Sequence, residues 1–297
     1  MAGGEHRSEA PPASPTSGLV LGAVAYDPKV VTIWDGFREW FRAQGLAFDY
    51  ALYSNYERQV EALVAGHVDV GWNSPLAWVR AERMARTAGL SAEAVAMRDT
   101  DCDLTSVVVV RADSDIRSVA DLSGRRVGVG AVDSPQATLI PLWHLSRQGA
   151  TGLEVVHYDI GVGKHGDHVG GEREAARSLV AGVVDAACMI DGNHLAFSAE
   201  GTLAPGTTRI LSQTPAYDHC NFTVLTGRPS PPLLERFTEL LLSMSYDDPD
   251  VRPLLDLEGL KQWRPGRTTG YHALREAVDE QGFYREDGTV TAAGYAP

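Results

Sequence analysis

The stretch SVADLSGRRVGVGAVDSPQAT, residues 118–138, contains signals for several structural elements in close succession. It predicts a short helix, then a strand in RVGVG, then a polar turn at Asp133 and Ser134 that opens a second helix. The first backbone N–H groups of a helix have no partner within it, so they can hold an anion. The order of strand, polar turn and helix therefore indicates a ligand-binding edge of an α/β sheet.

The chain continues this alternation of strands and helices on both sides of the stretch. Short apolar runs such as GLVLGAVAY (18–26) and LTSVVVVRADS (104–114) predict buried strands. Longer segments such as VVTIWDGFREWFRAQG (30–45) place apolar residues at helical spacing. We therefore expect parallel sheets with helices on both faces.

Two segments of the chain resemble each other. ALVAGHVDVGW (62–72) and SLVAGVVDAAC (178–188) share a helix end, a glycine and a short strand led by Val-Asp. A separation of about a hundred residues is too long for a solenoid repeat and favours a duplicated α/β half. With 297 residues and 44% hydrophobic content, the chain is long enough for two such domains.

Charge and composition limit the possible partners. The net charge is −13 and no basic run is present, which disfavours binding to nucleic acid or to anionic lipid. No apolar window is long enough to span a membrane. We therefore expect a small-molecule or ionic ligand, with no nucleic acid and no membrane insertion.

The first residues and the cysteines bear on location. Residues 1–18 lack periodicity and have no apolar h-region, so we expect a disordered tail and no secretory signal. Three well-separated cysteines do not form a disulfide framework. These features predict a cytoplasmic protein, or an extracytoplasmic one if the start is assigned wrongly.

The motifs together resemble a known family. VDVGWNSPLAWVRA, SDIRSVADLSGRRVGVG, DSPQAT and EREAARSLVAGVVDAA occur in the order found in the phosphonate-binding (PhnD-like) branch of the type II periplasmic solute-binding proteins. The resemblance spans roughly residues 19–275. It implies two Rossmann-like α/β lobes joined by two crossover strands, with the ligand in the cleft between them. On this pattern, residues 19–111 and 216–297 form lobe one, and residues 112–215 form lobe two.

The resemblance places candidate ligand-binding residues at the ends of strands and the starts of helices. They form clusters in both lobes: Tyr26 and Asp27; Trp72, Asn73 and Ser74; Asp133, Ser134, Gln136 and Thr138; Glu172, Arg173 and Asp191. Trp72 precedes a polar turn, so we favour stacking on a ligand over core packing. Arg173 suits either an anion or a surface ion pair. DSPQAT has fewer Ser and Thr residues than the corresponding turn of phosphonate binders, which weakens the prediction of a tetrahedral anion.

A histidine-rich turn predicts a possible metal site. In KHGDH, residues 164–168, His165, Asp167 and His168 are close enough in sequence to reach one ion. His194, His219 and Cys220 could complete a site for zinc, iron or copper if the cleft closes over them. The alternative is a solvated polar loop without metal.

His219 and Cys220 also raise the question of a catalytic dyad. Adjacent residues on an extended strand point to opposite faces, so we expect only one of the two side chains to face the cleft. A nucleophile-and-base pair is therefore disfavoured. The sequence also lacks the P-loop, G-x-S-x-G and H-E-x-x-H patterns of several enzyme classes.

Two functions follow from these observations. The first is a binding protein for a small, anionic, phosphonate-like solute, resembling the substrate-binding component of an ABC transporter. If the protein is secreted, its partner would be an ABC permease. The alternative is a cytoplasmic, metal-dependent biosynthetic enzyme on the same fold, acting on a small acidic or phosphorylated substrate. Chorismate dehydratase and the pyrimidine synthase of thiamin synthesis show that related folds host enzymes, although the cysteine-rich motif of the latter is missing here.

Overall fold

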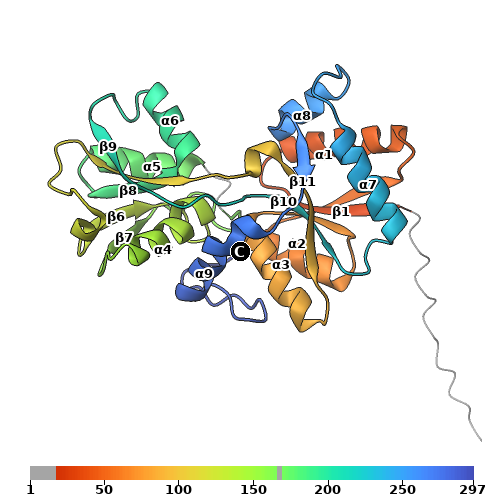
Figure 1. Cartoon of the computed structure of the whole chain (residues 1–297), viewed down its shortest axis with the longest axis horizontal. Coiled ribbons are helices and arrows are strands. Elements are labelled where there is room, and N and C mark those ends of the chain that lie inside the picture. Colours follow the sequence, from red (N-terminus) through yellow and green to blue (C-terminus); the bar gives the residue numbers. More distant parts are fainter. Residues whose placement is uncertain (1–17, 166–168) are drawn as a thin grey trace, which may run out of the picture.

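Two separate sheets divide the chain into two lobes in the computed structural model, which describes residues 18–165 and 169–297. All but Gly18 of the predicted tail lies outside these described residues. The sheet of lobe one has the order β11-β4-β10-β3-β1-β2 and that of lobe two the order β7-β6-β8-β5-β9 (Figure 1). The predicted two-lobed α/β architecture is therefore confirmed.

The strands of lobe one are β1 (Leu19–Val24), β2 (Phe48–Tyr53), β3 (Val70–Asn73), β4 (Ala92–Arg98), β10 (Asn221–Leu225) and β11 (Trp263–Pro265). Its helices are α1 (Lys29–Ala43), α2 (Tyr56–Ala65), α3 (Pro75–Thr87), α7 (Pro231–Ser243), α8 (Arg252–Glu258) and α9 (His272–Glu280). Lobe two contains β5 (Ser106–Arg111), β6 (Arg126–Val129), β7 (Glu154–His157), β8 (Ala186–Ile190), β9 (Thr208–Gln213), α4 (Ile140–Arg147), α5 (Val169–Val180) and α6 (Asp191–Ala199).

The two sheets are mixed, whereas the alternation of elements predicted parallel ones. Strands β1, β2 and β3 pair in parallel, but β10 runs antiparallel to β3 and β4. In lobe two, β6 is parallel to β7 and β8, while β5 is antiparallel to β8 and β9. The first strand after each passage between the lobes, β5 or β10, is thus antiparallel to both of its neighbours. Strand β11 is also antiparallel to β4.

The passages between the lobes are residues 99–105 and 214–220, which we call the crossover segments. The first connects β4 to β5 and the second connects β9 to β10. The sequence predicted the first boundary between the lobes at residue 112. In the structure, β5 (Ser106–Arg111) already pairs with strands of the second sheet, so the chain enters lobe two earlier. An isolated bridge between Leu104 and Tyr217 joins the two segments.

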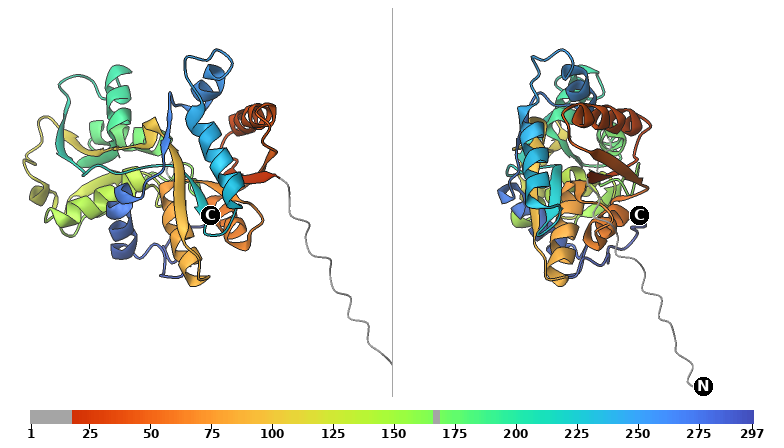
Figure 2. Two further views of the ribbon diagram at one scale, coloured as in Figure 1. Left: turned by 45° about the vertical axis from the view of Figure 1, so that its right-hand side comes forward. Right: turned by 90° about the vertical axis from the view of Figure 1, so that its right-hand side faces the viewer.

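Each sheet is covered on both faces by apolar side chains. In lobe one, α1, α7 and α8 pack against one face through residues such as Phe37, Phe237 and Leu255, and α2 and α3 cover the other (Figure 1 and Figure 2). In β5, Val107 and Val109 belong to one core and Val108 and Val110 to another. This two-sided burial explains the continuous apolar run of SVVVVR.

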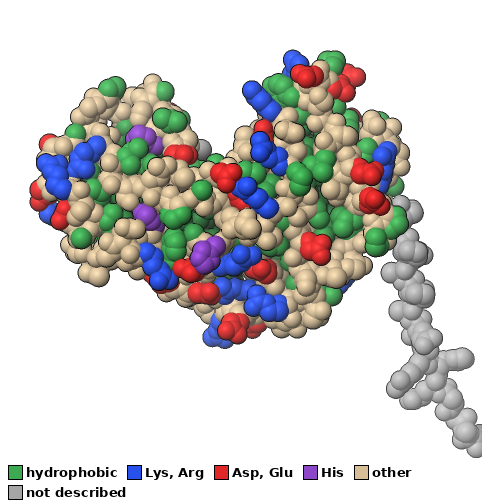
Figure 3. Space-filling model, in the orientation of Figure 1, with side chains coloured by type: hydrophobic (Ala, Val, Ile, Leu, Met, Phe, Trp, Pro, Cys, Tyr) green, Lys and Arg blue, Asp and Glu red, His purple; other side chains and the backbone are tan. Residues whose placement is uncertain are grey.

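Helix α9 joins the two lobes. It packs against α3 and also against α4 of lobe two, and its residues share one buried cluster with Leu139, Ile140 and Trp143. Gln281 extends the contact by donating to the carbonyl oxygen of Leu139 at 2.9 Å. Figure 1 shows α9 between the lobes, and Figure 3 shows the opposite side hollowed between them. Within the described ranges, no helix combines the length and apolarity needed to cross a bilayer.

Candidate ligand-binding site

Two helices, one from each lobe, begin with the same Ser-Pro arrangement. Ser74 caps α3, and its Oγ accepts from the backbone N–H of Ala77 at 3.1 Å. Ser134 accepts in the same way from Ala137 at 3.1 Å, at the start of a π-helical turn (Pro135–Leu139) that leads into α4. Both caps are almost completely buried. Each helix start therefore offers a positive dipole end, stabilised by a serine hydroxyl, at the inner side of its lobe.

His165 connects these two helix starts. Its backbone N–H donates to Oδ2 of Asp133 at 3.0 Å, next to the cap of lobe two. Its imidazole reaches lobe one, where Nδ1 lies 2.7 Å from Oγ of Ser74 and Nε2 lies 3.1 Å from Oε1 of Glu57. The ring also stacks on Tyr56 at a centroid distance of 4.7 Å. His165 is thus fully buried between the lobes, with a left-handed backbone φ of 51°.

The C-terminal segment completes the surroundings of His165. The hydroxyl of Tyr295 lies 3.1 Å from Nε2 of His165, and Tyr284 donates to Oε1 of Glu57 at 3.1 Å. Burial raises the pKa of Glu57, but the charge and hydrogen bond of His165 outweigh it and bring this pKa to about 2. Glu57 is therefore a carboxylate at neutral pH.

A second buried carboxyl group lies in lobe two. Oε2 of Glu172 accepts from the N–H of Ile190 at 2.9 Å and from Nδ2 of Asn193 at 2.8 Å, and Oε1 lies 3.5 Å from Nε2 of Gln136. Burial raises the pKa of Glu172 to about 7, against the opposing effect of these hydrogen bonds. Glu172 therefore changes charge near neutral pH.

Several other predicted ligand residues are held by partners within their own lobe or on a crossover segment. Asn73 is fully buried and donates to Thr223 at 2.8 Å, and Thr138 donates to the carbonyl oxygen of Ala131 at 2.8 Å. Asp191 accepts from the hydroxyl of Thr105 at 2.7 Å.

Tyr26 and Asp27 follow the end of β1. The carbonyl oxygen of Tyr26 accepts from Nζ of Lys164 at 3.1 Å, a further contact between the lobes. Asp27 is exposed and accepts from the N–H of Lys29 at 2.8 Å. Tyr26 therefore belongs to the contact between the lobes, whereas Asp27 serves the start of α1.

Trp72 lies in a different environment from the one expected, and Arg173 has one of the two roles considered for it. Trp72 is 6% exposed, and its ring packs against Phe222 and Trp263 in the aromatic core of lobe one. Arg173 is on the surface, where it forms two hydrogen bonds of 2.9 and 3.0 Å with Glu200. Core packing and a surface ion pair, the alternatives considered for these residues, match their positions.

Four residues of the predicted metal site, His165, His194, His219 and Cys220, belong to the described part of the chain, and of these His219 and Cys220 are in contact. His165 is engaged between the lobes, His194 lies on α6, and Asp167 and His168 lie outside the described residues. Among the described residues, the only group of at least three potential ligands with all ligand atoms within 4.8 Å consists of Asp101, His219 and Cys220.

The expectation that His219 and Cys220 point to opposite faces is wrong. Nδ1 of His219 lies 3.1 Å from Sγ of Cys220. Both residues belong to the crossover segment that ends before β10, so the alternation of side chains along a regular strand does not apply to them.

Sequence reasoning missed the residues of lobe one that surround His165. Tyr56, Glu57, Tyr284 and Tyr295 were not singled out, because no local motif marks them and two of them lie near the C-terminus. The repetition of Asn-Ser-Pro at 73–75 and Asp-Ser-Pro at 133–135 marks the two buried helix starts, which were among the predicted ligand residues, but it does not point to these four side chains.

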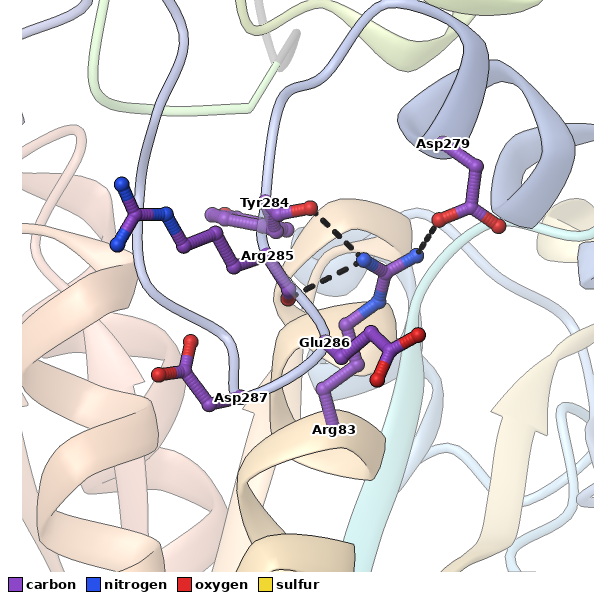
Figure 4. Close-up of a pocket in the computed structure, with 6 residues that line it drawn as sticks. All are labelled: Arg83, Asp279, Tyr284, Arg285, Glu286 and Asp287. Atoms are coloured by element: carbon purple, nitrogen blue, oxygen red, sulfur yellow. Dashed lines mark hydrogen bonds and ion pairs between the residues drawn. The ribbon is translucent and has the colours of Figure 1, made fainter.

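A different depression lies on the charged face between α3 and the C-terminal segment. It has a volume of about 510 Å³ and is lined by Arg83, Asp279, Tyr284, Arg285, Glu286 and Asp287. Figure 4 shows the Arg83 guanidinium held by Asp279 and by the carbonyl oxygens of Tyr284 and Arg285. These contacts satisfy Arg83 within the protein, so its charge serves to attach the C-terminal segment to α3.

The architecture and the buried helix starts between the lobes define a two-lobed solute-binding protein with the type II fold. The family described as the periplasmic phosphonate substrate-binding protein of ABC transporters matches residues 23–271. This chain belongs to that family.

Solved structures agree with this fold. PhnD1 from Prochlorococcus marinus in complex with methylphosphonate has a TM-score of 0.64 at 17% identity, covering 90% of this chain and 98% of its own. A Xanthomonas citri protein bound to a chloride ion has a TM-score of 0.67 at 20% identity, covering 89% and 98%. The aliphatic sulphonate binding protein SsuA from Escherichia coli has a TM-score of 0.52 at 17% identity, covering 89% and 91%. No curated protein matches the sequence.

Family membership confirms the first predicted function and corrects the location. The chain is a substrate-binding protein of the ABC transporter type, and the similarities give no support to the alternative of an enzyme. The prediction of a cytoplasmic location is wrong, because the family consists of periplasmic proteins. Receptors of importers meet their solute outside the cytoplasmic membrane, and the composition of the first residues did not reveal this.

Proposed function

We propose that the protein captures a small phosphonate between its lobes and delivers it to an ABC permease. The observation that carries this proposal is the meeting of two serine-capped helix starts, at Ser74 and Ser134, around His165. Helix N-termini favour anions through their dipoles and free N–H groups. A tetrahedral anion has enough oxygen atoms to accept hydrogen bonds from both lobes at once. Binding of the anion would therefore be coupled to closure of the lobes.

His165 takes part in this proposal as a mobile contact. In the present arrangement its imidazole lies within hydrogen-bond distance of the Ser74 hydroxyl and the Glu57 carboxylate, both in lobe one. A phosphonate oxygen that replaces the imidazole at Ser74 leaves an N–H of His165 available to donate to the ligand. The same residue would therefore hold the lobes in the absence of ligand and bind the ligand when it enters.

Asp133 favours a phosphonate that also carries an amino group. Its side chain is completely buried, and within the described part of the chain its Oδ1 accepts no hydrogen bond. Such an oxygen is costly to leave unpaired. An ammonium group beside the phosphonate supplies the missing donor, so we expect an aminoalkylphosphonate to bind more tightly than methylphosphonate.

Calorimetric titration of the purified protein tests this proposal. The panel consists of methylphosphonate, 2-aminoethylphosphonate, phosphate and sulfate, with arginine as a cationic control. We expect binding of the phosphonates, and a loss of about 10- to 100-fold in affinity for each of Ser74→Ala and Ser134→Ala, since a hydrogen bond to a charged group contributes about 1.5–3 kcal/mol.

Ser118→Ala is the matched control for these variants. Ser118 caps a short helical turn (Val119–Leu122) with an exposed side-chain contact to Asp121, away from the helix starts considered above. Its replacement should leave phosphonate affinity unchanged. Absence of phosphonate binding by the wild-type protein, or equal losses in all three variants, contradicts the proposed site.

A further inference from the structure

We propose that Asp101, His219 and Cys220 form a zinc-binding site that joins the two crossover segments. Asp101 lies on the first segment, and His219 and Cys220 lie on the second. These three side chains offer one carboxylate oxygen, one imidazole nitrogen and one sulfur. A mixed O/N/S set suits zinc, which is borderline in its preference between hard and soft ligands.

The distances between the ligand atoms fit one small ion. Nδ1 of His219 lies 3.4 Å from Oδ1 of Asp101 and 3.1 Å from Sγ of Cys220. Around a tetrahedral zinc with bonds of about 2.0–2.3 Å, neighbouring ligand atoms are about 3.3–3.6 Å apart. The His219–Cys220 pair is about half an ångström closer than a tetrahedral zinc requires, and all three ligand atoms lie within 4.8 Å of one another.

The backbone already holds the two segments in register. The N–H of His219 donates to the carbonyl oxygen of Asp101 at 2.8 Å. The hydroxyl of Tyr271 donates to the carbonyl oxygen of His219 at 2.6 Å. The ligands are therefore preorganised before any ion arrives, which lowers the entropic cost of binding.

The surroundings provide a second layer of contacts and a route for entry. Arg98 donates to both oxygens of Asp101 at 2.5 and 2.9 Å and also contacts Glu258. Carboxylates that bind metals are commonly oriented by such partners. Asp101 is 2% exposed and Cys220 6%, but the side chain of His219 is 12% exposed, so solvent reaches the group at its imidazole.

The charge of the cluster also favours a dication. Arg98 contributes one positive charge, whereas the buried Asp101 and Glu258 contribute one negative charge each. Counting these three side chains, the cluster has one excess negative charge. Zinc binding with release of the Cys220 thiol proton to water adds two positive charges and one negative charge, which makes the buried group neutral.

A bound ion would fix the crossover segments to each other at their lobe-one ends. Opening of the lobes would then be confined to the lobe-two ends of the segments. Zinc would act as a structural element of the hinge, with a fourth position left for water.

The test uses the full-length protein after treatment with a chelator. Zinc titration by calorimetry should give one equivalent, and cobalt substitution should give a thiolate-to-cobalt charge-transfer band. Cys220→Ser should abolish the band, and both Cys220→Ser and His219→Gln should weaken zinc binding at least tenfold. The thiol of Cys102 and the exposed imidazole of His272 provide the matched controls, since Cys102→Ser and His272→Gln should bind zinc as the wild type does.

The possible results separate clearly. Absence of zinc binding and of the cobalt band in the wild-type protein overturns the proposal, and so does zinc affinity equal to wild type in both Cys220→Ser and His219→Gln. Titration with methylphosphonate in parallel reports on the solute site independently. A protein that binds zinc but no phosphonate supports the metal site and contradicts only the proposed function.

Discussion

At the scale of single residues, the buried Glu172 has a direct effect on stability. Its pKa of about 7 in the folded protein exceeds the ordinary value of 4.5. A carboxyl group with a raised pKa contributes stability that is fully present below about pH 4.5 and is lost as the pH rises through about 7. The protein should therefore become less stable between pH 5 and pH 8 through this group alone.

Glu172→Gln tests this effect. The substitution keeps the shape and removes the ionisation. Between these pH values, the free energy of unfolding of the wild type should therefore fall by roughly 2–3 kcal/mol more than that of the variant. Denaturant unfolding at pH 5 and pH 8 measures both differences. An equal pH dependence in the two proteins contradicts a neutral, buried Glu172.

The sequence predicted the position of single residues only where a local pattern marks them. The polar turn at Asp133 and Ser134 was detected because a serine and a proline at a helix start form a local signal. Trp72 was misplaced because its neighbours in sequence are polar, whereas its packing partners Phe222 and Trp263 are distant in sequence. The partners of His165 were missed for the same reason.

At the scale of elements, the start of α5 lies very close to the residue that follows β7. A Cβ atom at Gly171 would lie 2.6 Å from the carbonyl oxygen of Tyr158, so alanine there must displace the backbone. Gly192, in the first turn of α6, has no atom within 4 Å of the same position. Two helical glycines in the same lobe therefore differ in the space that they leave.

Gly171→Ala should lower the free energy of unfolding by about 1–3 kcal/mol, the usual cost of overpacking. Gly192→Ala should leave it unchanged or raise it by up to about 1 kcal/mol, because alanine has the higher helix propensity. Thermal and denaturant unfolding of the two variants measure the contrast. Equal stabilities would show that α5 moves away from Tyr158 without cost.

Elements were predicted well where their pattern is local. The continuous apolar run of β5 and the amphipathic pattern of α1 both correspond to observed elements. Strand direction was not predicted, since the antiparallel place of β10 between β3 and β4 depends on segments more than a hundred residues away.

At the scale of the whole molecule, two sets of contacts hold the lobes together. His165 provides hydrogen bonds from lobe two to Ser74 and Glu57. Helices α9 and α4 share an apolar cluster and are also joined by hydrogen bonds of Trp143 and Arg147 to Glu276, both at 3.1 Å. Ligand-free His165→Ala should therefore be more open, with a larger radius of gyration in small-angle X-ray scattering. Loss of two buried hydrogen bonds is expected to shift the ratio of open to closed molecules at least tenfold.

His157→Ala is a suitable control for this experiment, because His157 contacts the carbonyl oxygen of Gly130 within lobe two. Its scattering curve should match that of the wild type. Identical curves for His165→Ala and wild type would indicate that the contact between α9 and α4 holds the lobes by itself.

The place of β10 in the middle of the first sheet also determines the order in which the molecule can assemble. Lobe two is one continuous segment, residues 106–213, and has all its strands before β10 is reached. Strands β3 and β4 have no ladder with each other and remain separate until β10 is inserted between them. During vectorial synthesis or translocation, the inserted lobe can therefore fold first, while the lobe that begins the chain is completed last.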